Sequence, residues 1–65
     1  MEEEKIVYRD KTIAVTLIEL VGGKWLSAVS IDGKHVATKK LPFAVKDDAR
    51  THAVDAAMAV IDRIQ

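Results

Sequence analysis

The side chains that could support acid–base or metal chemistry are few and scattered along this chain. It has two histidines, His35 and His52, and no cysteine. A zinc site needs three or four ligands, whereas His52 and Asp55 together would offer only two from one side of a helix. Neither histidine has an evident carboxylate to orient it as a general base. We therefore predict no catalytic residue, no metal site and no cofactor.

Serine chemistry has no better support. Ser27 and Ser30 fall in a β-prone stretch and lack the Gly-x-Ser-x-Gly elbow that exposes a nucleophile. The sequence therefore indicates a protein that is not an enzyme.

Positive charge is concentrated in the middle of a chain whose ten basic and ten acidic residues cancel overall. Between residues 24 and 46 the only acidic residue is Asp32, and the basic ones are Lys24, Lys34, Lys39, Lys40 and Lys46. Such a segment could bind phosphates, or its lysines could protect an edge strand from aggregation. We favour the protective role, and we expect Trp25 to belong to the core rather than to stack on a base.

Two glycine-containing turns divide the β-prone part of the chain. Gly22-Gly23 separates a strand over residues 12–21 from one over residues 24–31. Asp32-Gly33, which suits a type I′ turn, leads into a return strand over residues 34–41 that Pro42 ends.

The N-terminal segment is harder to assign. Residues 1–5 are charged and are expected to be frayed. Residues 6–8 are β-prone, and a break or tight turn near Asp10 is expected because one strand from Lys5 to Val21 would be too long. Whether residues 6–8 form a separate fourth strand stays open.

The turns also predict which side chains share a face of the sheet. A two-residue Asp32-Gly33 loop places Val29 opposite Val36, and Ser27 opposite Thr38. A three-residue loop over residues 21–23, with a glycine bulge, is preferred because it joins the large residues of both strands into one apolar surface. The expected core face then carries Ile13, Val15, Leu17, Trp25, Ser27, Val29, Ile31, Val36 and Thr38.

A helix is predicted over residues 47–64, with Asp47 as its N-cap. At about 100° per residue, its apolar stripe contains Ala49, Ala53, Ala56, Ala57, Val60, Ile61 and Ile64. The opposite, solvated side carries Asp48, Thr51, His52, Asp55 and Asp62. An alanine-rich stripe allows the helix to lie close to the sheet, and Phe43 is expected to fill one end of the core.

Residues 25–64 resemble the last two strands and the final helix of the double-stranded RNA-binding domain. The resemblance lies in Ile31-Asp32-Gly33-Lys34-His35-Val36 and in Lys46-Asp47-Asp48-Ala49-Arg50. It implies phosphate contacts at Lys46 and Arg50, although Asp47 stands where that family has a lysine. The strand and helix order is also similar to that of small antitoxins of the HicB type, which neutralise a partner toxin.

Together these elements predict a single α+β domain over residues 1–65. It consists of a three-stranded antiparallel sheet, or four-stranded if residues 6–8 pair, packed on one C-terminal helix. One helix covers one face of the sheet, so the other face needs a partner. We expect a non-catalytic protein-interaction module that binds a second copy or another protein through Ile18, Leu20, Leu26 and Ala28 of this open face. A homodimer through an edge strand is the other arrangement that the sequence allows. The alternative is a weak nucleic-acid binder that uses Lys34, Lys39, Lys40, Lys46 and Arg50.

The chain has no apolar run near the roughly 20 residues of a membrane span, and its N-terminus is acidic rather than signal-like. The lack of cysteine fits a reducing compartment. We therefore expect a cytoplasmic protein without membrane contact.

Overall fold

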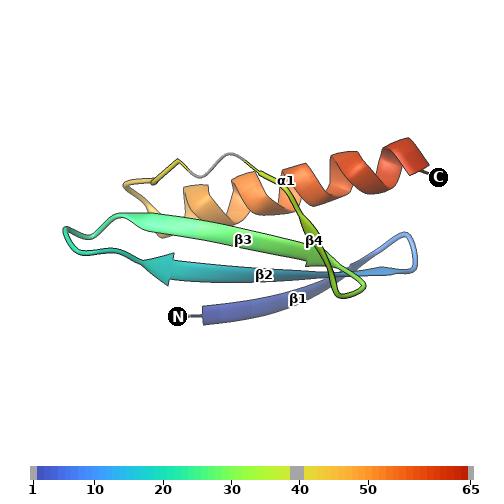
Figure 1. Ribbon diagram of the computed structural model, residues 1–65, viewed down its shortest axis with the longest axis horizontal. Coiled ribbons are helices and arrows are strands. Elements are labelled where there is room, and N and C mark those ends of the chain that lie inside the picture. The colour runs from blue at the N-terminus through green and yellow to red at the C-terminus, as the bar shows by residue number, and fades with distance from the viewer. Residues whose placement is uncertain (1, 39–40, 65) are drawn as a thin grey trace.

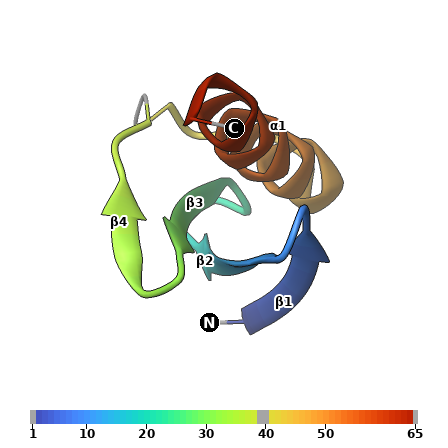
Figure 2. The same cartoon turned by 90° about the vertical axis from the view of Figure 1, so that its right-hand side faces the viewer.

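Four antiparallel strands pair in the order in which they occur along the chain. The computed structural model describes residues 2–38 and 41–64. The strands are β1 (Glu2–Tyr8), β2 (Lys11–Glu19), β3 (Trp25–Ile31) and β4 (Lys34–Val36), and α1 (Lys46–Ile64) follows them. Figure 1 shows α1 lying along one face of the sheet, and Figure 2 shows the sheet curving beneath it. The predicted α+β class is confirmed, with the fourth strand present.

The N-terminal segment is more ordered than its composition suggests. The sequence predicts that residues 1–5 are frayed, but residues 2–5 belong to β1. This strand pairs with β2 from Glu2↔Leu17 to Tyr8↔Lys11. A tight turn at Arg9-Asp10 joins the two strands, with φ of 51° and 65°. Two positive φ values in a two-residue loop are typical of a type I′ turn. The predicted interruption near Asp10 is therefore a hairpin, and its ladder orders the charged residues.

The second hairpin is short. Asp32 and Gly33 have φ of 50° and 85°, as a type I′ turn requires, and Val29 lies opposite Val36 as predicted. The predicted extension of this strand to residue 41, with Thr38 opposite Ser27, is wrong because β4 ends at Val36. Instead, Phe43 exchanges two backbone hydrogen bonds of 2.8 Å with Trp25. Residues 39 and 40 lie outside the described part of the chain.

The loop between β2 and β3 has the predicted three-residue length. The N–H of Leu20 donates to the carbonyl of Lys24 at 2.7 Å, which leaves residues 21–23 as the loop. Gly22 and Gly23 have φ of 95° and 80°, a region that favours glycine. The register that results pairs Val15 with Val29, so the large residues of both strands share one face.

The core lies between this face and α1. Its sheet side consists of Ile13, Val15, Leu17, Val29 and Ile31, and its helix side of Ala49, Ala53, Val54, Ala57 and Ile61. Trp25 and Phe43 pack against it while remaining partly exposed. The predicted core face of the sheet is confirmed for Ile13, Val15, Leu17, Ser27, Val29 and Ile31, and the predicted helix stripe for Ala49, Ala53, Ala57 and Ile61.

The helix differs from the prediction in its start and in its rotation. It begins at Lys46, and the N–H of Ala49 donates to the carbonyl of Val45, so Asp47 lies in the first turn and is not the N-cap. Val54 is buried, whereas Ile64 is 65% exposed. Val54 is buried because it lies on the side of α1 that faces β1, the side from which Arg50 contacts Glu4. Ile64 is exposed because the last turn of the helix lies at the margin of the core.

Candidate interaction surfaces

The open face of the sheet, on the side away from α1, collects the side chains predicted for a protein interface. Ile18 lies directly opposite Leu26. Two residues further along the strands, and on the same face, Thr16 lies opposite Ala28. Leu20 continues on the same side by alternation. Ile18 is 37% exposed, and Leu20, Leu26 and Ala28 are half-buried. The structure therefore brings all four predicted residues together.

This open face is graded from apolar to polar along the strands. Ile18, Leu20 and Leu26 lie at the end near the 21–23 loop, whereas Ser30 and His35 form a pair nearer the Asp32-Gly33 turn. Between them on β2 and β3 lie the small side chains of Ala14, Thr16 and Ala28, and the middle of the face is bordered on β1 by Glu3 and Lys5. In Figure 2, α1 lies on the opposite side of the sheet, and no helix or strand among the described residues covers the open face.

The contact between β1 and α1 is mainly polar. Because side chains alternate along a strand, Glu2, Glu4 and Tyr8 all point toward the helix. Lys46 bonds to Glu2, and Arg50 Nε lies 2.6 Å and 3.1 Å from the two carboxylate oxygens of Glu4. The Tyr8 hydroxyl donates to Asp62 at 3.0 Å. Three polar contacts between side chains thus link the first, second and last turns of α1 to β1.

Arg9 contacts both members of the Tyr8–Asp62 pair. Its Nε donates to the Tyr8 hydroxyl at 3.4 Å and lies 3.2 Å from Asp62 Oδ1. The hydrogen bond to Tyr8, the charge of that group and the carboxylate of Asp62 raise the pKa of Arg9 above its ordinary value.

The described basic residues of the nucleic-acid hypothesis, Lys34, Lys46 and Arg50, are not gathered at one place. Lys46 and Arg50, the two suggested by the resemblance, are engaged by Glu2 and Glu4 at the N-terminal end of α1. Lys46 also lies 5.4 Å from the centre of the Trp25 ring. Lys34 lies beside the C-terminal end of the helix instead. Lys39 and Lys40 lie outside the described residues.

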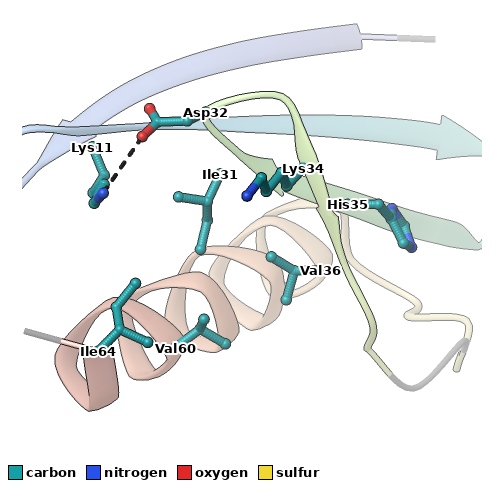
Figure 3. A pocket seen from close by; sticks show the side chains of 8 residues that line it. All are labelled: Lys11, Ile31, Asp32, Lys34, His35, Val36, Val60 and Ile64. Carbon is teal, nitrogen blue, oxygen red and sulfur yellow. Dashed lines mark ion pairs between the residues drawn. The ribbon is translucent and has the colours of Figure 1, made fainter.

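Lys34 lines a half-open groove of about 260 Å³ that the sequence did not predict (Figure 3). Its walls are formed by Ile31, Val36, Val60 and Ile64, and Lys11 and Asp32 form an ion pair of 3.8 Å at its edge. In Figure 3 the His35 side chain points away from the other lining residues. The groove exists because β4 ends at Val36 while α1 continues beside it, and neither boundary has a clear signal in the sequence.

His52 was expected on the solvated side of the helix, but it is half-buried. Its ring centre lies 5.2 Å from that of Phe43, at an interplanar angle of 44°. The buried Nε2 atom has no hydrogen-bond partner among the described residues. The loop that brings Phe43 to Trp25 therefore also covers this histidine.

Comparison with known proteins adds no relative: no family model, curated protein or solved structure matches this chain. Within residues 2–38 and 41–64, no three histidine, aspartate or glutamate side chains gather as they would around a metal ion. The helix in the same part of the chain is not apolar enough to cross a membrane.

Proposed function

We propose that this chain is a non-catalytic protein-interaction module that self-associates through the open face of its sheet. The observation that supports the proposal is the Ile18–Leu26 cross-strand pair, flanked by Leu20 and Ala28 on a face that no described element covers. Contiguous apolar surface of this kind usually marks an interaction site.

A second copy of the chain suits this face for two reasons. A closed two-fold dimer is the commonest way to bury such a patch, because one patch then serves both partners. The grading of the face also favours an overlay in which the two Ile18–Leu26 pairs meet. The small side chains of Thr16 and Ala28 let two sheets approach to the roughly 10 Å at which sheets usually pack.

The alternative, a nucleic-acid-binding domain, has less support. Two of its five basic residues, Lys46 and Arg50, already neutralise carboxylates of β1. Binding phosphate there would require those ion pairs to break. Titration with duplex RNA and single-stranded DNA at low salt tests this alternative directly, since contacts to phosphate weaken steeply as salt rises.

The face proposal is tested by sedimentation equilibrium of a Leu26→Lys variant. A charged side chain in the centre of the apolar cluster should lower the self-association constant at least about tenfold, because it would be buried without a partner. Val21→Lys is the matched control, since Val21 lies in the loop and is 104% exposed. Self-association that is equal in both variants would exclude the open face as the interface.

A further inference from the structure

The outer edge of β1 is the long unpaired edge of the described sheet. β1 has seven residues and β2 on one side only, because the strand order is β1-β2-β3-β4. The opposite edge, β4, has three residues. In β4 the residues on either side of His35 bond to β3, so His35 alone presents backbone groups outward. Of the two edge strands, only β1 is long enough to form a ladder with a strand of another molecule.

The hairpin geometry shows which residues of β1 present their backbone outward. Next to a two-residue turn, Tyr8 and Lys11 form a hydrogen-bonded pair, and such pairs alternate along an antiparallel ladder. The backbone groups of Glu3, Lys5 and Val7 therefore point away from β2. The backbone of Thr12, which lies opposite Val7, supports this assignment because it points away from β1. Its N–H donates to the Asp32 carboxylate at 2.9 Å, and its carbonyl accepts from the Asp32 N–H at 2.8 Å.

From this edge we infer that β1 pairs antiparallel with β1 of a second copy, with Glu3 opposite Lys5 of that copy. The registers on either side of it place Glu3 opposite Glu3, or Lys5 opposite Lys5, and like charges directly opposite destabilise a strand pair. A register centred on Ile6 places Lys5 opposite Val7 and forms no attractive charge pair. The chosen register forms two Glu3–Lys5 pairs about a two-fold axis at Glu4. Neither Glu3 nor Lys5 forms an ion pair with any described residue of its own copy.

The helix side of the same strand is compatible with this register. Glu4 would lie opposite Glu4 of the second copy, which on its own would be repulsive. Each Glu4 carboxylate, however, already binds Arg50 of its own helix at 2.6 Å. The centre of the paired edge would then hold two carboxylates and two guanidinium groups, whose charges cancel. The charges of this edge thus favour the register that pairs Glu3 with Lys5 over the other registers.

The backbone edge of β1 differs from the open face of the proposed function, although the Glu3 and Lys5 side chains lie on the open-face side of the sheet. Neither interface requires the other. Edge pairing joins two sheets side by side, whereas face pairing stacks them. A chain that uses both would form an assembly larger than a dimer, with two kinds of two-fold axis. The Leu26→Lys variant, which removes the face contact, isolates the edge contact for study.

Charge reversal in the Leu26→Lys background tests the edge. Glu3→Lys and Lys5→Glu should each lower self-association about tenfold or more, because two attractive pairs become repulsive. An equimolar mixture of the two variants should associate as a heterodimer, since the lysines of one edge then face the glutamates of the other. The double variant Glu3→Lys/Lys5→Glu should associate as its parent does.

Two controls match these charge changes. Glu19→Lys and Lys34→Glu alter exposed residues away from β1 and should leave association unchanged. Circular dichroism of each variant verifies folding, and the series is repeated in the wild-type background in case Leu26→Lys does not fold. Single variants that associate like their parent, or a mixture that gains nothing over its components, would overturn the inference. Loss of the edge effects with an intact response to Leu26→Lys would leave the face interface standing alone.

Discussion

Arg50 on α1 and Glu4 on β1 form an ion pair in which one guanidinium nitrogen lies 2.6 Å and 3.1 Å from the two carboxylate oxygens. The residues are 46 positions apart in the sequence. The pair lies beside the buried helix stripe that contains Ala49 and Ala53. It therefore ties the outermost strand of the sheet to the element that covers the core.

A double-mutant cycle with Glu4→Gln and Arg50→Gln should give a coupling free energy of about 0.5–1 kcal/mol in urea unfolding. The value is modest because both side chains are about two-fifths exposed, at 41% and 38%. Roughly 1 M salt should remove most of it by screening. A coupling that persists in high salt would show that the two residues interact through packing rather than charge.

The type I′ turn at Asp32-Gly33 gives a second prediction. Gly33→Val should lower the free energy of unfolding by about 1–2 kcal/mol, because φ at Gly33 is 85° and a β-branched side chain resists that conformation. Gly33→Asn is the control and should lose less, since asparagine tolerates positive φ. Apart from Gly33 and its two neighbours in the chain, no atom lies within 4 Å of the position of an added Cβ. The comparison therefore measures strain in the backbone and not a clash. Equal melting temperatures for all three proteins would disprove the turn.

The close approach of α1 to the sheet depends on alanine. Ala57 is fully buried, with 0% exposure, so Ala57→Leu should overpack the interface and cost about 1–3 kcal/mol. Ala59→Leu makes the same change on the exposed side of the helix and should be nearly neutral. Chemical denaturation of the two variants supplies the measurement. A stable Ala57→Leu protein would mean that the helix can move away from β2 and β3 at little cost.

His52 is expected to lower stability. Its Nε2 atom is buried without a hydrogen-bond partner among the described residues, and such an atom costs about 1–3 kcal/mol. His52→Leu, which keeps the contact with Phe43 but removes the nitrogen, should raise the midpoint of urea unfolding. His35→Leu, at an exposed position on β4, is the control. A lower midpoint for His52→Leu would indicate that the nitrogen does have a partner.

Local sequence determined the turns and the register between β2 and β3. Asp32-Gly33 and Gly22-Gly23 have conformations that few other residue pairs adopt, and each turn fixes which side chains of the adjoining strands share a face. Since a slip of one residue would expose Val15 and Val29, the hydrophobic pattern supports the same register. The core face and the four residues of the open face follow from these local constraints.

Tertiary structure decided the rest. Residues 2–5 have a charged sequence that would be frayed in isolation, yet they form a strand because β2 offers a complete ladder and α1 offers partners for Glu2 and Glu4. These partners lie more than 40 residues away, at separations of 44 and 46 positions, so no local pattern could indicate them. The end of β4 at Val36 depends likewise on the bonds that Phe43 makes with Trp25. Local propensity thus fixes how each hairpin folds, whereas the position of its outer strands depends on contacts that exist only after the helix has packed.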